Sequence, residues 1–333
     1  MTTNNNNTDQ AFSSAGVKQE AGLHDPMRNL PAPPMNLAAK PHSPALPRWR
    51  ERLRAYALLV RFHRPIGSLL LLWPALWALW LAGEGRPPWT VVLIFVAGVF
   101  LMRSAGCAIN DFADRKVDSR VRRTRERPLA TGMVSAREAI GVFLALSLAA
   151  FLVALPLNWI TIALAPIALA LAALYPFMKR YTYWPQVFLG AAFGWAVPMA
   201  YTAVTGTVPL QGWLLFLATL IWALIYDTQY AMVDIEDDLK VGIKSTAIRF
   251  GRHDRLIIGL LQGAFLAIMA FIGLDAGRGG WYLLGLGVAA GFAVYQQVLI
   301  RHREPGACFQ AFLNNNYLGL ALFAGLFLDY ALP

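Results

Sequence analysis

The sequence has little charge and few residues of the types that hold structural metals or cross-links. Only 14% of its 333 residues are charged, against roughly 25% in an average soluble chain. Two cysteines, Cys107 and Cys308, exclude a disulfide framework or a thiolate cluster, and five scattered histidines exclude a His-rich zinc site. Because 57% of the residues are hydrophobic, a soluble globular enzyme is not expected.

Apolar stretches dominate the chain after residue 65. Nine of them are each near the ~20 residues that cross a bilayer as a helix. They cover roughly 66–83, 90–109, 139–155, 158–174, 186–204, 212–227, 256–274, 281–300 and 312–331. The sixth is short, which suits a tilted or shielded helix. The pattern predicts an all-α polytopic membrane protein built as a nine-helix transmembrane bundle.

The first 46 residues differ in kind from the rest. They contain an asparagine run, several prolines and few large apolar residues, so they cannot bury enough surface to fold. We therefore expect a disordered cytosolic tail over 1–46 and one membrane domain over 47–333. No apolar core precedes residue 55, so neither a secretory signal nor a transit peptide is expected. This favours a bacterial cytoplasmic membrane over the alternative, a mitochondrial inner membrane.

Lys and Arg residues are concentrated in the loops on one side of the predicted spans. Of the 29 Lys and Arg residues, 26 fall on one side of the predicted spans and two on the other. By the positive-inside rule, the N-terminus is cytosolic and the C-terminus lies outside after nine crossings. The net charge of +10 does not indicate a nucleic-acid partner, because the basic residues alternate with long apolar runs instead of sharing a soluble face.

Acidic residues gather where two predicted spans end. Asn110, Asp111, Asp114 and Asp118 follow the second span and would share one face if its helix continued through them. After the sixth span, a continued helix would put Asp227, Asp234 and Asp238 on one stripe with Tyr230, while Glu236 would point away. Four crossings separate the two spans, so both rows must face the same compartment.

These two acidic rows indicate a cation site. Carboxylates stacked on one helix face repel each other, so a strong cation is needed between them. Magnesium prefers oxygen ligands and commonly reaches a phosphate substrate through one or two carboxylates. The alternative is that the rows are ordinary solvated loops. The matched position of two rows favours a metal-diphosphate site.

Several motifs carry a resemblance to a known family. The sequence resembles the UbiA-type intramembrane prenyltransferases over about 55 to 331, and among them the 4-hydroxybenzoate polyprenyltransferases of ubiquinone biosynthesis. The matching segments are 61–67, 72–74, 110–116, 127–129, 175–180, 226–231, 242–245 and 314–317.

The resemblance implies a nine-helix bundle with a central cavity capped on the cytosolic side. It implies a Mg²⁺-dependent enzyme in the lipid bilayer that transfers a polyprenyl chain from its diphosphate to 4-hydroxybenzoate, at the ring carbon ortho to the phenol. The metal ligands would be Asn110, Asp111, Asp114, Asp118, Asp234 and Asp238. The same aspartates and Asp227 would be the catalytic residues, and Asn110 would also contact the substrate.

Basic residues on the same side are candidates for the anionic groups. Lys179 and Arg180 lie between spans four and five, and we expect Arg180 to contact either the diphosphate or the benzoate carboxylate; the alternative is an ordinary positive-inside pair. Arg64 is a further substrate contact, unless it only snorkels to lipid headgroups. Arg103 lies inside an apolar span, where a charge costs at least ~2.5 kcal/mol, so we expect it to face the cavity.

Two other functions stay open at this point. A member of the same family could use another aromatic acceptor, such as homogentisate or a naphthoate. A cation-coupled transporter could use the aspartates as its ion site, although transporters usually place such groups near the bilayer midplane. Here the acidic residues lie at the predicted helix ends.

Overall fold

A computed structural model describes residues 48–121 and 123–332, and the predicted tail lies outside these residues. Within the described ranges all regular structure is helical. The α-helices are α1 (Arg48–Leu59), α2 (Ile66–Ala82), α3 (Trp89–Asp114), α4 (Ala136–Ala154), α5 (Trp159–Met178), α6 (Pro185–Gly194), α7 (Ala196–Thr205), α8 (Leu210–Ala231), α9 (Ile235–Val241), α10 (Thr246–Phe250), α11 (Asp254–Asp275), α12 (Gly280–Leu299) and α13 (Pro305–Ala331). Short 3₁₀ turns include η1 (Asp118–Arg120).

Each predicted span corresponds to one apolar helix, or one pair of helices, in the described part of the chain. Eight helical segments are long and apolar enough to cross a membrane, and α2, a shorter apolar helix of 17 residues, corresponds to the first predicted span. The all-α polytopic prediction is therefore confirmed. The sixth span is not short: α8 has 22 residues.

The fifth crossing is broken into α6 and α7. Pro198 lies four residues after Gly194 and has no N–H to bond its carbonyl, so the helical ladder is interrupted at this point. The two pieces still cover Pro185–Thr205, one membrane crossing.

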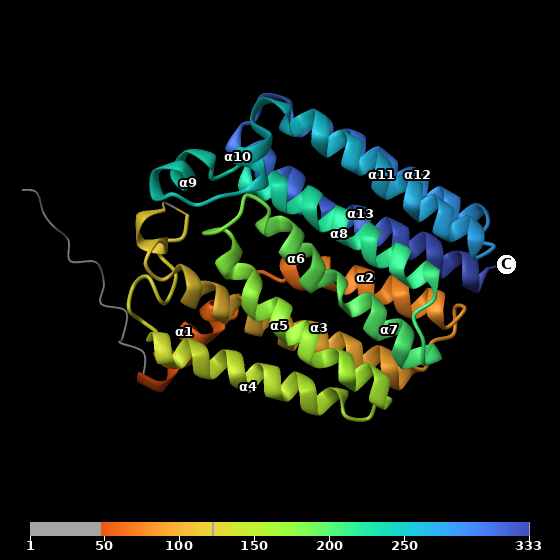
Figure 1. Ribbon diagram of the computed structural model, residues 1–333, viewed down its shortest axis with the longest axis horizontal. Helices are drawn as coiled ribbons and strands as arrows, with labels where there is room; N and C mark the ends of the chain where they lie inside the picture. Colours follow the sequence, from red (N-terminus) through yellow and green to blue (C-terminus); the bar gives the residue numbers. More distant parts are fainter. Residues whose placement is uncertain (1–47, 122, 333) are drawn as a thin grey trace, which may run out of the picture. The chain divides into compact units, whose positions relative to one another are not determined.

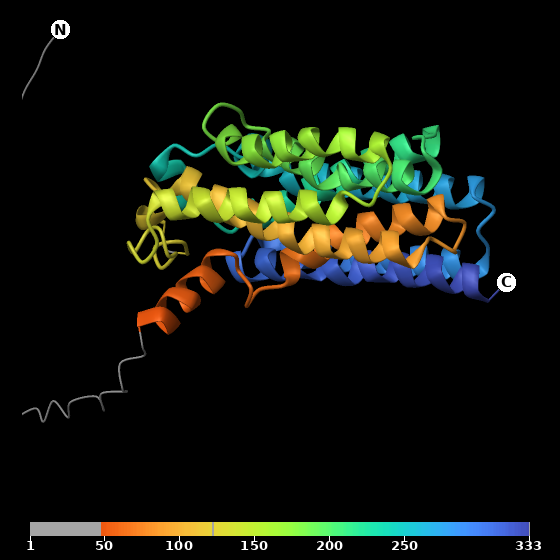
Figure 2. The same cartoon turned by 90° about the horizontal axis from the view of Figure 1, so that it is seen from below.

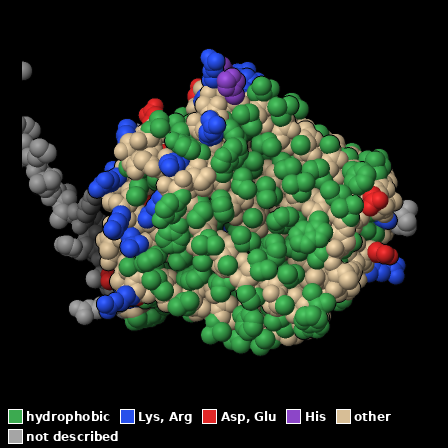
Figure 3. Space-filling view, in the orientation of Figure 1, with side chains coloured by type: hydrophobic (Ala, Val, Ile, Leu, Met, Phe, Trp, Pro, Cys, Tyr) green, Lys and Arg blue, Asp and Glu red, His purple; other side chains and the backbone are tan. Residues whose placement is uncertain are grey.

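The long helices run side by side along one axis, and the two ends of the bundle differ (Figures 1 and 2). One end carries α1, the α3–α4 loop, α9 and α10, and we call it the charged end. The opposite end holds only short turns and the C-terminus (Figure 1). Figure 3 shows Lys and Arg gathered at the charged end and hydrophobic side chains over the middle of that face, as expected for a surface that contacts lipid.

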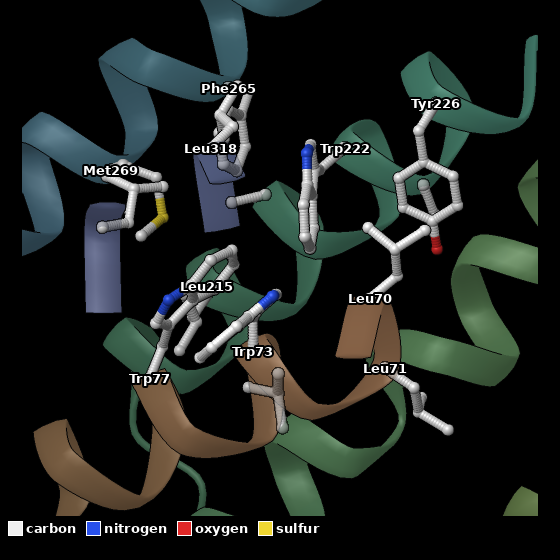
Figure 4. Close-up of a cluster of buried hydrophobic side chains, with 14 of the residues drawn as sticks. Leu70, Leu71, Trp73, Trp77, Leu215, Trp222, Tyr226, Phe265, Met269 and Leu318 are labelled. Carbon is white, nitrogen blue, oxygen red and sulfur yellow. The ribbon is translucent and has the colours of Figure 1, made fainter. Parts of the chain in front are cut away.

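Aromatic side chains form the centre of the bundle (Figure 4). Trp77 of α2 and Trp222 of α8 are buried with ring centroids 5.2 Å apart, and Phe265 of α11 stacks on Trp222 at 6.1 Å. Gly319 of α13 lies against Trp73, where an added Cβ would come within 2.5 Å of the indole ring. Close packing of this kind holds α2, α8 and α13 together.

Candidate active site

A polar cavity of about 460 Å³ lies at the charged end of the bundle. Residues of both predicted acidic rows line it: Asn110 and Asp111 from the end of α3, and Asp227, Asp234 and Asp238 from α8 and α9. The cations around the cavity are Arg61, Arg64, Arg103, Arg123, Arg127, Lys179 and Lys244. Part of each row therefore faces one space, although the rows are more than a hundred residues apart in sequence; Asp114 and Asp118 are not among the lining residues.

The first row is buried among basic side chains. Asp111 is 1% exposed and accepts from Arg61 at 2.7 Å. Asp114 pairs with Lys179, which follows α5. Asp118 lies 3.0 Å from Arg127. Burial of charge is tolerated when each ion is paired, and here each of these carboxylates has a cation beside it.

The second row is held by one arginine from the α3–α4 loop. Asp234 accepts from the Nε of Arg123 at 2.9 Å. The same guanidinium lies over the Tyr230 ring, 4.4 Å from its centroid, and donates to the Tyr230 hydroxyl. Arg123 therefore links the loop that follows the first row to the helix end that carries the second.

The single-helix geometry expected for each row is wrong. The α3 helix ends at Asp114, and Asp118 begins the separate turn η1. The α8 helix ends at Ala231, Asp234 is the residue before α9, and Asp238 lies inside α9. A straight continuation would stack like charges with no cation between them. The turns instead bring Arg127 and Arg123 against the carboxylates.

The basic residues divide into those that line the cavity and those that do not. Lys179 and Arg64 line it, but Arg180 is absent from its wall and donates to the backbone carbonyl of Ala113. We therefore revise the prediction for Arg180: its guanidinium satisfies a carbonyl in the last turn of α3. Lys179 and Arg180 follow the end of α5, where helical phase no longer predicts which side chain faces inward.

Sequence reasoning missed three cations. Arg61, Arg123 and Arg127 each contact a predicted aspartate. Arg61 and Arg127 lie in matching motifs that carry the family resemblance, which was a usable signal. Their partners were not predictable, because a loop residue has no periodicity from which to derive a direction.

Arg103 faces the cavity, as expected, and marks its inner limit. Its side chain lines the polar cavity and also a second, apolar cavity of about 490 Å³. Among the described residues, its Nε has no hydrogen-bond partner although it is buried. Its Nη1 donates to Cys107 Sγ, so the Nε–H is the unused donor, and this group is suited to binding an anion.

The apolar cavity lies between α3, α4, α5 and the α6–α7 crossing. Gly98, Met102, Leu148, Phe151 and Leu169 are part of its lining. It shares Arg103, Tyr175 and Phe193 with the polar cavity, so the two cavities are adjacent and these side chains lie between them. The polar cavity suits an anion, and the adjacent apolar cavity suits a hydrocarbon.

Carboxylate oxygens are the donors that this site offers to a metal. No three His, Cys, Asp or Glu side chains of residues 48–121 and 123–332 converge as a complete metal site. Asp114 Oδ1, however, is buried without a hydrogen-bond partner among the described residues. The donor set suits a hard cation that takes only a few protein ligands and completes its shell with substrate oxygens.

Burial affects the titration of two of these acids. It raises the pKa of Asp118 to about 6, opposed by the nearby charge of Arg127. It also raises the pKa of Asp238 to about 7, with the charge of Asp234 adding to the effect. Both carboxyls are therefore partly protonated near neutral pH unless a cation is bound.

Comparisons with known proteins agree on one family. The UbiA prenyltransferase family model matches residues 71–323. The chain is similar to the 4-hydroxybenzoate octaprenyltransferase of Methylococcus capsulatus, with 60% identity over 84% of this chain and 96% of that protein. It is also 60% identical to the octaprenyltransferase of Nitrosococcus oceani that has the same name, over 84% of this chain and 99% of that protein.

Solved structures share the fold. A UbiA homolog from Aeropyrum pernix K1 superposes with a TM-score of 0.71 at 26% identity, over 79% of this chain and 97% of that chain. A UbiA homolog from Archaeoglobus fulgidus bound to GPP and Mg²⁺ gives a TM-score of 0.65 at 19% identity, over 84% of this chain and 100% of that chain. The helix arrangement described above is therefore the one seen in these proteins.

Proposed function

Because this chain belongs to the UbiA prenyltransferase family, we propose that it transfers a polyprenyl chain from polyprenyl diphosphate to 4-hydroxybenzoate in ubiquinone biosynthesis. The observation that carries this proposal is the junction of the two cavities. An allylic diphosphate with a long hydrocarbon tail needs an anion site that continues into an apolar space. The polar and apolar cavities are adjacent in this way, with Arg103, Tyr175 and Phe193 between them.

The donor's diphosphate fits the polar cavity. Its negative oxygens would lie among Arg61, Arg127 and Lys179, which already line that space. Arginine and lysine contacts to phosphate are charge-assisted hydrogen bonds and stronger than neutral ones. The tail would extend past Arg103 into the apolar cavity, where its hydrocarbon is removed from water. The allylic carbon–oxygen bond, which breaks first, would then lie at the junction of the two cavities.

The residues present fit a magnesium ion. The candidates for its oxygen ligands are Asn110, Asp111, Asp114, Asp118, Asp234 and Asp238, of which only a few would bind one ion while diphosphate oxygens complete its shell. Asp227 is a further acid of the cavity wall. The unpartnered Asp114 Oδ1 is the observation that supports this assignment. When bound, the metal neutralises charge that develops on the leaving diphosphate oxygens.

The acceptor is an anion, so it needs a cation of its own. Arg103 is placed at the depth where the reacting carbon of the donor would lie, and its Nε is unused. We assign the acceptor carboxylate to this guanidinium. The ring then lies beside the donor's allylic carbon, with its phenol away from the carboxylate.

The reaction follows from this placement. The allylic carbon–oxygen bond breaks and the diphosphate leaves with the electron pair, stabilised by preorganised cations. The ring carbon ortho to the phenol forms the new carbon–carbon bond, and the ring then loses its proton. Tyr175 and Phe193 line the junction and exclude water, which would otherwise capture the allylic cation as an alcohol.

The deciding experiment compares acceptors. Membranes that contain the protein are incubated with a labelled polyprenyl diphosphate and 4-hydroxybenzoate, homogentisate or a naphthoate, with and without chelator. We expect prenylated 4-hydroxybenzoate only, and none with chelator. Turnover of another acceptor with none of 4-hydroxybenzoate would assign the protein to a different branch of the family. The transporter alternative has no support, because the acids lie at the bundle end and not at its middle.

The proposal includes an orientation. The protein is a polytopic membrane protein, and the basic loops lie at the end that carries the site. We place this end and the N-terminus in the cytosol and the C-terminus outside, in a bacterial cytoplasmic membrane. A C-terminal alkaline phosphatase fusion should be active, and a C-terminal fluorescent reporter that folds only in the cytosol should be dark. The reverse pattern would contradict this orientation.

A further inference from the structure

The three aspartates of the first row lie close to one basic side chain, that of Arg127. The Arg127 guanidinium lies 3.2 Å from Asp111, 3.8 Å from Asp114 and 3.0 Å from Asp118. These carboxylates come from two elements, α3 and η1, and each is at most 6% exposed. One basic side chain therefore lies beside all three acids, in addition to Arg61 at Asp111 and Lys179 at Asp114.

The backbone around Arg127 is held while its side chain has room to move. The Thr124 hydroxyl donates to the carbonyl of Asp118 at 2.9 Å, and the Arg127 N–H donates to the Thr124 carbonyl at 3.0 Å. These bonds return the loop over the end of α3. The Arg127 side chain is 17% exposed and also lines the polar cavity. It can therefore reach a ligand in the cavity without a change in the loop.

We propose that Arg127 is an exchangeable internal counter-ion of the first acidic row. Without metal it acts with Arg61 and Lys179 to neutralise Asp111, Asp114 and Asp118, and it keeps the three together because it lies within 4 Å of each. When a metal and the diphosphate enter, the carboxylates pass from Arg127 to the metal, and the guanidinium turns to the diphosphate oxygens. The inference rests on the proposed function, since it takes the three acids to be metal ligands.

If Arg127 exchanges partners in this way, its substitution should change metal affinity in the opposite direction from substitution of an ordinary site residue. Arg127 and the metal compete for the same carboxylate oxygens, so removing the Arg127 charge strengthens metal binding in the absence of donor. It simultaneously removes a diphosphate ligand and so weakens donor binding. A residue that only supported the fold would weaken both.

The test measures metal binding without donor. Mn²⁺, which prefers the same oxygen ligands as Mg²⁺, is titrated into the full-length protein in lipid nanodiscs, and free Mn²⁺ is followed by electron paramagnetic resonance. We expect Arg127→Gln to bind Mn²⁺ about tenfold more tightly than the unchanged protein. Its KM for polyprenyl diphosphate should rise by at least about tenfold. The matched control is Arg125→Gln, in the same loop with an exposed side chain, which should stay within about twofold for both.

Each outcome decides the proposal. Unchanged or weaker Mn²⁺ binding by Arg127→Gln overturns the counter-ion role and leaves the proposed function intact. If the unchanged protein binds no Mn²⁺ and also fails with 4-hydroxybenzoate, the proposed function fails with it. Should Arg127→Gln not fold, Arg127→Lys keeps the charge: the inference expects its Mn²⁺ affinity to remain within about threefold of the original. A large gain in affinity in the lysine variant would contradict the inference.

Thermal unfolding gives a second readout. Without metal, Arg127→Gln leaves three buried carboxylates with two cations beside them, Arg61 and Lys179, so its Tm should fall below that of the unchanged protein. Saturating Mn²⁺ should close most of that gap, because the metal takes the place of the lost charge. A gap of the same size with and without Mn²⁺ would show a purely structural role.

Discussion

The polar and apolar cavities have nearly the same volume, about 460 and 490 Å³, but are built in different ways. The polar cavity is lined by the ends of several helices and by the loops beside them, and its side chains are fixed by ion pairs between distant residues, such as Arg61 with Asp111 and Arg123 with Asp234. The apolar cavity lies between regular helices, and small residues such as Gly98 and Ala168 leave its space open.

This difference separates two tasks. Charged groups on turns can exchange partners when a substrate enters, whereas a gap between continuous helices keeps its shape. We therefore expect substitutions in the polar cavity to remove catalysis with every donor, and substitutions in the apolar cavity to change which donor chain lengths are accepted.

The largest effect is expected at Asp111. Asp111→Asn removes a carboxylate from the metal site and leaves Arg61 without its charged partner. Turnover with any donor should fall about 10³-fold, the scale of losing one preorganised electrostatic contact. Steady-state kinetics with 4-hydroxybenzoate measures this. The control is Asp275→Asn at the opposite end of the bundle, where the side chain is exposed and activity should be unchanged. Substantial turnover by Asp111→Asn would contradict the metal assignment.

Lys179 should have the next largest effect. Lys179→Gln removes the cation that pairs with Asp114 and lines the polar cavity. We expect kcat/KM for the donor to fall about 10²-fold, for long and short chains alike, because the diphosphate loses a charge-assisted contact. Lys116→Gln, an exposed lysine beside the first row, should stay within about twofold. A loss of activity confined to long donors would contradict the claim that the polar cavity acts on the diphosphate of every donor.

The apolar part of this architecture could be predicted from the sequence because the bilayer imposes it. A helix must cover a fixed thickness, so hydropathy located each crossing to within a few residues at most ends, although α13 begins seven residues before the predicted span and the short α9 and α10 were not predicted. Parity placed both acidic rows at one end. The break between α6 and α7 follows from Pro198, but one proline does not reveal whether a helix kinks or stops.

The polar part was only partly predictable. Spacing identified the acids, yet it put Asp118 and Asp234 on continued helices, because periodicity carries no information about the cations that make a turn favourable. For the same reason the sequence favoured Arg180 over Lys179, and it left Arg127 unassigned. Pairings across 111 residues, such as Arg123 with Asp234, come from the tertiary fold alone.

The pH dependence should separate the two acidic rows. Burial raises the pKa of Asp238 to about 7 and that of Asp118 to about 6, so both are protonated below these values and cannot then hold a metal. At subsaturating Mg²⁺, kcat/KM should therefore rise about tenfold or more between pH 6 and 8. High Mg²⁺ should shift the rise to lower pH, because metal competes with protons. Asp238→Asn should remove the part of the rise in kcat/KM that lies near pH 7. If the variant keeps that part of the rise, that part belongs to another group.

The smallest and most selective effect is expected at Gly98 in the apolar cavity. A Cβ at Gly98 would meet no atom within 4 Å, so Gly98→Phe can be built, and its ring would lean along α3 away from the charged end. It should block the tail of a long donor and spare the first isoprene units. The ratio of kcat/KM for octaprenyl diphosphate to that for geranyl diphosphate should fall about tenfold, as apolar contacts are lost along the chain. Gly287→Phe on α12 is the matched control, since that glycine is exposed and also has open space at its Cβ. An unchanged ratio in Gly98→Phe would mean that the tail leaves the junction by another route, and the two cavities would then not act as head and tail sites of one substrate.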